Sequence, residues 1–280
     1  MAKILLNNFG VDAAKAFRQD LDDNTYYIWL GNPNVWSNEA SPPVPTGTIA
    51  EEVYARTNME YLVKVTQSDS CLCIPLITWT IDTIYNQYSA TDPLLYSEAF
   101  YVMNNNNVYK CFSNNSGANS LNPPTGQSPN TVITADGYNW KFMYDISSTF
   151  ATNFMTNSFI PVPTGLQVSS LQLNVQNSAV YATGSPPKGH GYAAEYELGA
   201  NSVIINKVAP FTALVTDFTH RQFGLIKNPL LTNGNPADAA VIVVDDTFDV
   251  MSGSMSLMNN HLVVSTSDDV SETFQIVLSF

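Results

Sequence analysis

The segment from Asp136 to Ile146, DGYNWKFMYDI, constrains the fold more than any other part of this sequence. Large aromatic side chains occupy every second position of it: Tyr138, Trp140, Phe142 and Tyr144. Successive side chains of a β-strand point to opposite faces, whereas the faces of a helix repeat every 3.6 residues. The alternation therefore predicts a strand with one strongly aromatic face, and it places Trp140 in the core.

Other runs rich in β-branched and aromatic residues predict further strands. They lie at 26–30, 61–66, 71–80, 100–103, 108–112, 203–208, 222–227, 240–245 and 261–265. The first of them, YYIWL, is apolar on both faces, so both faces should be covered. The run Asn104–Asn107 suits a tight turn because Asn tolerates positive φ, and the polar stretch 113–130 should be a loop. The fold class predicted is mainly β, with sandwich-like or barrel-like sheets.

The chain closes on ETFQIVLSF, in which Phe274, Ile276, Leu278 and Phe280 share one face. Such an apolar terminus should pair inside a sheet, with partners distant in sequence and close to YYIWL. This predicts a discontinuous main domain built from residues 1–85 and 166–280. A middle β domain, 86–165, would be inserted between them, and its end could extend to about residue 200.

One short N-terminal helix is predicted. Apolar residues recur at three- and four-residue spacing up to Leu21, and Asp12 could cap a helix over residues 13–21. The polar run Asp22–Asn24 would end it.

The chain of 280 residues is acidic and sparsely charged. Only 12% of its residues are charged, and the formal net charge is -13. Without a Lys/Arg cluster, such a surface repels phosphate backbones and anionic lipid, so we expect neither nucleic acid nor a membrane as partner. No apolar run approaches the roughly 20 residues that span a bilayer, and no signal peptide is evident.

No pattern of catalytic or cofactor-binding residues is present, so we expect no enzyme, no cofactor, no metal and no small-molecule substrate. His190, between two glycines and followed by Glu195 and Glu197, is the nearest approach to a metal site, but it lacks a second histidine. The pair His220–Arg221 suits a strand end better than an anion site. The acidic clusters do not follow the calcium-loop pattern. Cys71, Cys73 and Cys111 are expected to be buried thiols.

Two loop aromatics are candidate contact residues. Trp36 lies in a polar, proline-rich loop after YYIWL, and Tyr88 lies in a second loop. Trp and Tyr combine apolar area with a polar tip, so they can stack on sugars or anchor protein interfaces.

Several motifs in a fixed order carry a resemblance to a known family. These are NTYYIWLGNPNVW with its Pro-rich loop, IPLITWTIDTIYNQY, NNNNVYKCF, NPPTG, DGYNWKFMYDI, FIPVP, HRQFGLIKNPL and ETFQIVLSF. From about Asn24 to Phe280 the chain resembles the baseplate wedge subunits of T-even-type contractile-tailed phages, the gene product eight family. The loop 113–130 and the segment around His190 depart from that pattern.

The resemblance implies a structural protein of the virion tail, made in the host cytoplasm, without catalytic residues. It implies a homodimer in each of six wedges, joined to other wedge proteins and helping to couple host recognition to sheath contraction. Two alternatives stay open. One is a carbohydrate-binding or adhesion β-module that uses Trp36 and Tyr88, and the other is a hydrolase or metal enzyme centred on His190.

Overall fold

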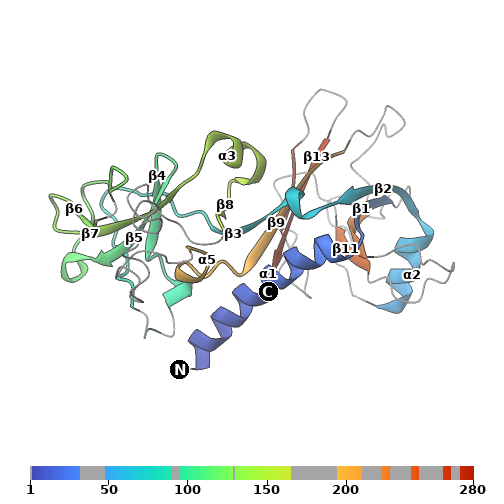
Figure 1. The fold of residues 1–280 in the computed structure, drawn as a ribbon, viewed down its shortest axis with the longest axis horizontal. Helices are drawn as coiled ribbons and strands as arrows, with labels where there is room; N and C mark the ends of the chain where they lie inside the picture. The colour runs from blue at the N-terminus through green and yellow to red at the C-terminus, as the bar shows by residue number, and fades with distance from the viewer. Residues whose placement is uncertain are drawn as a thin grey trace, which may run out of the picture. The chain divides into compact units, whose positions relative to one another are not determined.

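The computed structural model describes residues 2–31, 48–89, 92, 95–128, 130–164, 194–209, 222–227, 241–245, 261–265 and 272–280. The chain divides into two compact units (Figure 1). Unit 1 comprises residues 1–13 and 72–201, and unit 2 comprises residues 14–71 and 202–280. The described elements are mostly antiparallel strands with few helices, which confirms the mainly β class. The domain limits predicted from the sequence stay a prediction.

Unit 1 contains a four-stranded antiparallel sheet in the order β4-β5-β7-β6. Its strands are β4 (Tyr101–Asn104), β5 (Asn107–Ser113), β6 (Val132–Ile133) and β7 (Asn139–Asp145). A second antiparallel pair joins β3 (Ser70–Pro75), whose first two residues belong to unit 2, to β8 (Phe159–Val162). The short helices are α3 (Ser148–Phe154), α5 (Ala194–Glu197), η2 (Leu95–Ser97) and η3 (Asn115–Gly117).

The turn between β4 and β5 confirms the tight turn expected from the asparagine run. Asn105 and Asn106 have φ values of 50° and 61°, the left-handed region that Asn enters more easily than most residues. Asn104 pairs with Asn107 across this turn, so the hairpin register follows directly from the sequence.

Unit 2 contains a second four-stranded antiparallel sheet in the order β11-β10-β1-β2. Its strands are β1 (Tyr26–Gly31), β2 (Met59–Val65), β10 (Gln222–Lys227) and β11 (Val241–Asp245). Helix α2 (Ile49–Thr57) lies against β11, and η1 (Gln67–Asp69) follows β2. Ile28 and Trp29, adjacent residues of β1, are both buried, which confirms that both faces of this strand are covered.

The C-terminal strand β13 (Glu272–Ser279) lies between β12 (His261–Ser265) and β9 (Ser202–Ala209). It is paired within a sheet as expected, but the expectation that its partner lies near YYIWL was wrong. Both edges of β1 are occupied by β2 and β10, so no edge is left for β13. Eight register pairs with β9 bury Ile276, Val277 and Leu278 instead.

The N-terminal helix α1 (Ala2–Asp23) is longer than expected. Its residues up to Ala13 belong to unit 1, and the rest belong to unit 2. Asp12 is therefore inside the helix and does not cap it. Gly10 lies within the helix in a buried position, and burial of its neighbours Val11 and Ala14 offsets the low helix propensity of glycine. The expected strand 71–80 ends at Pro75, since proline cannot continue the ladder.

Candidate interaction surface

Tyr88, one of the two predicted contact residues, lies half-buried in unit 1. Its N–H donates to the carbonyl of Cys111 at 2.8 Å, and its ring centroid lies 5.9 Å from that of Phe100. The ammonium nitrogen of Lys110 lies 3.8 Å from the centroid of the Tyr88 ring. A sugar stacks on an open aromatic face, and this cation already occupies one face of Tyr88. The geometry therefore disfavours Tyr88 as a sugar platform.

Lys110, on β5, points its ammonium group into unit 1 and donates to the carboxylate of Glu197 on α5. The exposed fractions of the two side chains are 6% and 29%. Burial lowers the pKa of Lys110, and the charge of Glu197 opposes that shift. Burial also raises the pKa of Tyr88 to about 12, with Glu197 adding to the rise. An amine this buried is stable only beside its carboxylate, so the pair fixes α5 against β5.

Further contacts hold the same helix. The hydroxyl of Tyr96 donates to the carbonyl of Tyr196 at 3.2 Å, and the hydroxyl of Tyr196 donates to the carboxylate of Asp12. Gly199, just after α5, has φ +67° and lies so close to the Tyr96 ring that an added Cβ would come within 2.1 Å of it. Sequence reasoning missed this arrangement. The available signal was Lys110 itself, a lysine within an otherwise apolar and aromatic strand.

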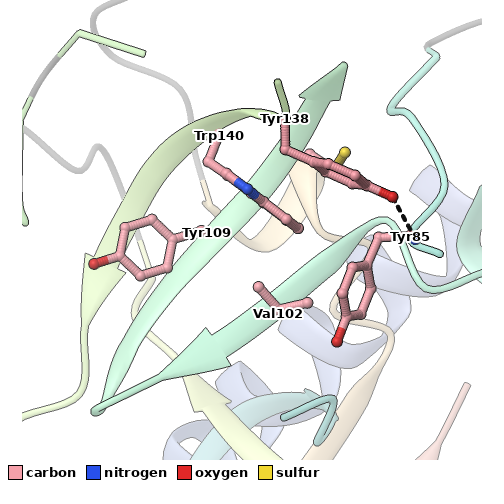
Figure 2. Packing of buried hydrophobic residues seen from close by; sticks show 6 residues of the cluster. Tyr85, Val102, Tyr109, Tyr138 and Trp140 are labelled. Atoms are coloured by element: carbon pink, nitrogen blue, oxygen red, sulfur yellow. Dashed lines mark hydrogen bonds between the residues drawn. The ribbon is translucent and has the colours of Figure 1, made fainter. Parts of the chain in front are cut away.

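Strands β4, β5 and β7 contribute to a buried core that is mostly aromatic. It consists of Tyr85, Val102, Tyr109, Cys111, Tyr138 and Trp140. Tyr138 stacks on Trp140, with ring centroids 5.4 Å apart. Figure 2 shows both rings together with the hydrogen bond from the N–H of Tyr85 to the Tyr138 hydroxyl. The prediction that Trp140 belongs to the core is confirmed, since it is fully buried. All three cysteines are buried free thiols, as expected.

The carboxylate of Asp136 connects several loops at one end of this core. It accepts from the N–H groups of Leu121 at 2.6 Å and Asn122 at 2.9 Å, and from the hydroxyls of Ser120 and Thr134. Partial burial alone would raise the pKa of Asp136, but hydrogen bonds from the Thr134 hydroxyl and from the N–H groups of Asn122, Leu121 and Tyr138 lower that pKa to about 2. Asp136 is thus a structural anion that ties the segment 120–122 to the segment 134–138.

Four aliphatic side chains of the segments that meet near Asp136 are exposed to solvent. Ile81, Ile84, Leu121 and Ile133 have exposed fractions between 51% and 73%. Ile81 and Ile84 flank the residue pair Asp82–Thr83, which hydrogen-bonds to Ser120. Leu121 and Ile133 are neighbours in sequence of Ser120 and Thr134. Phe9 and Phe112 are further exposed apolar residues of unit 1.

The other candidate residues fall outside the described residues. These are Trp36, His190 and the pair His220–Arg221. Glu195 and Glu197, proposed with His190 as possible metal ligands, both lie on α5, where Glu195 is buried and Glu197 binds Lys110. Within the described ranges, no group of three or more potential metal ligands is found. Among those same residues, no helix has the length and apolarity needed to span a bilayer.

The sequence also matches known proteins. Residues 102–280 match the profile of the family described as "Bacteriophage T4, Gp8". A curated relative, "Baseplate wedge protein gp8" of Enterobacteria phage T4, is 24% identical over 309 aligned residues, covering 92% of this chain and 90% of the relative. The matched region contains strands β5 to β7 with Lys110 and Asp136, helix α5 and the C-terminal strands β9 to β13. The family profile covers well over half of the chain, and the chain therefore belongs to the phage T4 Gp8 family.

Proposed function

We propose that this protein is a structural subunit of the baseplate wedge in the tail of a contractile-tailed phage. The observation that carries the proposal is the family match together with the relative, aligned over nine-tenths of both chains and named as a baseplate wedge protein. An alignment over nearly the full length of both proteins favours the same overall role in the virion, because the shared part is not one module of a larger protein.

The proposed role includes self-association and contacts with other wedge proteins, through which the subunit helps to couple host recognition to sheath contraction. The composition supports it, since a subunit buried on several sides needs surface without many charges, and only 12% of this chain is charged. The interior supports it as well. The Lys110–Glu197 pair and the Asp136 node brace loops and α5, so that the surfaces they carry are preorganised for assembly.

The proposed subunit is not an enzyme and uses no cofactor, metal or small-molecule substrate. Nucleic acid and membrane are not among its partners. A net charge of -13 supports this assignment because it opposes binding to phosphate-rich surfaces.

Trp36 and Tyr88 are proposed to contribute to subunit contacts. Tyr88 would act through its ring, which shields the ammonium group of Lys110. Tyr88→Phe keeps that ring and should assemble normally, whereas Tyr88→Ala should assemble less well. If Tyr88→Ala and Trp36→Ala both entered tails as efficiently as the parent protein, neither residue would be a contact.

The proposed function is tested by deleting the gene from the phage that encodes this chain. Loss of complete baseplates and of infectious particles, restored by supplying the gene in trans, is the expected result. Normal tails with intact baseplates in the deletion strain would overturn the proposal. Particles that assemble normally but fail to bind host glycans would favour the adhesion module.

A further inference from the structure

Strand β2 (Met59–Val65) forms one edge of the sheet β11-β10-β1-β2 in unit 2. Its inner edge pairs with β1, and among the described residues nothing hydrogen-bonds to its outer edge. An edge strand presents a row of N–H and C=O groups that can pair with a strand of another chain. With seven residues, β2 is long enough for such pairing.

The side chain of Leu62 is apolar surface that β2 leaves uncovered. Leu62 pairs with Trp29 of β1, so the two residues share one face of the sheet. Trp29 is fully buried, whereas Leu62 is 44% exposed. Burial of this face therefore decreases from β1 to the edge at β2, and a strand added beside β2 would bury more of Leu62.

The charged residues of β2 are placed symmetrically about Leu62. Glu60 lies two residues before it and Lys64 two residues after it, so the three positions share one face of the strand. If the β2 strands of two copies pair antiparallel with Leu62 opposite Leu62, position 60 of each copy lies opposite position 64 of the other. Each glutamate is then opposite a lysine. Opposite charges across a strand pair stabilise it, whereas like charges destabilise it.

Charged residues on an edge strand often prevent pairing, but those of β2 are complementary in this one register. The other described edge strands lack this arrangement. Strands β11 and β12 contain no lysine or arginine, β6 has only two residues, and β8 contains Pro161, which has no N–H to donate. The outer side of β4 is occupied, because Met103 exchanges hydrogen bonds with the segment 77–79.

We propose that the outer edge of β2 pairs with the same edge of a second copy of this chain, antiparallel and centred on Leu62. The contact joins two four-stranded sheets into one continuous antiparallel sheet. It is symmetric, with one Glu60–Lys64 pair on each side of the two-fold axis. The inference rests on the self-association included in the proposed function, and it adds the surface and the register.

Cross-linking tests the centre of the contact. Residues directly opposite in an antiparallel pair have Cα atoms about 4.5–5.5 Å apart, which a disulfide can bridge. Mild oxidation of the purified full chain should therefore give a covalent dimer with Leu62→Cys, and the native cysteines are buried thiols that add little background. Lys64→Cys is the matched control. The two copies of position 64 would be about 14 Å apart, so this variant should not cross-link.

Sedimentation velocity tests the charges. Glu60→Lys and Lys64→Glu each place like charges opposite one another, and each should raise the dissociation constant of the dimer at least about tenfold. The double substitution Glu60→Lys/Lys64→Glu restores opposite charges in the same register and should return that constant to within about threefold of the parent value. Asp22→Lys, at an exposed position of α1, changes the net charge as Glu60→Lys does and should leave the constant nearly unchanged.

Thermal unfolding of each purified variant checks that it is folded. A parent chain that sediments as a monomer at every concentration removes self-association from the proposed function, and this inference with it. A parent dimer that the charge reversals leave intact, or that Leu62→Cys does not cross-link, overturns the inference alone. Reversals that dissociate the dimer without rescue by the double substitution contradict the register. Reversals that leave the dimer intact but keep the chain out of co-expressed wedges show that the edge binds a different protein, and the inference is wrong.

Discussion

The β4–β7 sheet of unit 1 and the β9–β13 strand pair of unit 2 are packed with different side chains. The core of the β4–β7 sheet is aromatic, and the hydroxyls of Tyr85, Tyr109 and Tyr138 each bond to a loop. In unit 2, β9 and β13 are held by aliphatic side chains: Val203, Ile204, Ile205, Ile276, Val277 and Leu278. An aliphatic core stabilises strands alone, whereas a tyrosine core also reaches outward and positions loops.

The ion pairs of the two units also differ in how far they are buried. Lys110–Glu197 in unit 1 has a nearly inaccessible lysine, and it joins residues 87 positions apart. Lys207–Asp69 in unit 2 is partly exposed at both ends, 24% and 19%. A pair that water reaches contributes less to stability, and its loss leaves a charge that can be resolvated.

The largest expected effect concerns the two cores. Trp140→Ala should lower the free energy of unfolding by roughly 3–5 kcal/mol, because it removes a fully buried ring that stacks on Tyr138. In unit 2, Ile205→Val removes a single methylene from a fully buried side chain and should cost only about 0.5–1.5 kcal/mol. Denaturant unfolding of both variants measures the two losses. A loss for Trp140→Ala as small as that for Ile205→Val would mean that the Trp140 ring does not hold the core of the β4–β7 sheet together.

The ion pairs provide the second comparison. Glu197→Gln should destabilise by roughly 3 kcal/mol, because it leaves the ammonium of Lys110 buried without its carboxylate. Lys110→Met/Glu197→Gln should recover much of that loss, since no buried charge remains. Asp69→Asn in unit 2 should cost only about 1 kcal/mol. Destabilisation by Asp69→Asn as large as that by Glu197→Gln would contradict the ranking.

Asp136 gives the third comparison. Asp136→Ala should cost about 2 kcal/mol, because its carboxylate accepts from two N–H groups and two hydroxyls. The folded-state pKa of about 2 lies below the ordinary value of 3.8. Stability from this group is therefore fully present above the ordinary value and is lost as pH falls through about 2. The variant should lack that part of the acid dependence in thermal melts, and an unchanged pH profile would contradict this assignment.

The smallest effect tests the tyrosine hydroxyls. Tyr138→Phe should destabilise by about 1–2 kcal/mol, since the hydroxyl donates to Ala118 O and accepts from Tyr85 N–H inside the core. Tyr54→Phe on α2, which is 38% exposed, should change stability by less than about 0.5 kcal/mol. Indistinguishable melting temperatures for the two variants would remove the proposed link between the aromatic core and the loops.

Local patterns predicted much of the fold. The alternation of Tyr138 and Trp140 predicted β7, and the asparagine run predicted the β4–β5 turn, because both depend on neighbours in sequence. The extension of α1 to Ala2 was not predicted, since the burial around Gly10 comes from distant residues. Strand β8 was not among the predicted strands, and its Pro161 pairs with Cys73.

The candidate site was harder to predict for the same reason. The environment of Tyr88 is created by Lys110 and Glu197, which lie far from it in the sequence. No periodicity in the sequence reports contacts at that range. The aromatic character of Tyr88 was visible, but the cation covering its ring was not.

Electron cryomicroscopy of tails from the phage that encodes this chain would decide whether the protein is a wedge subunit. Density for this protein in every wedge of the baseplate is the expected result. Absence of the protein from the baseplate, or its presence only at the tip of a fibre, would contradict the proposed function.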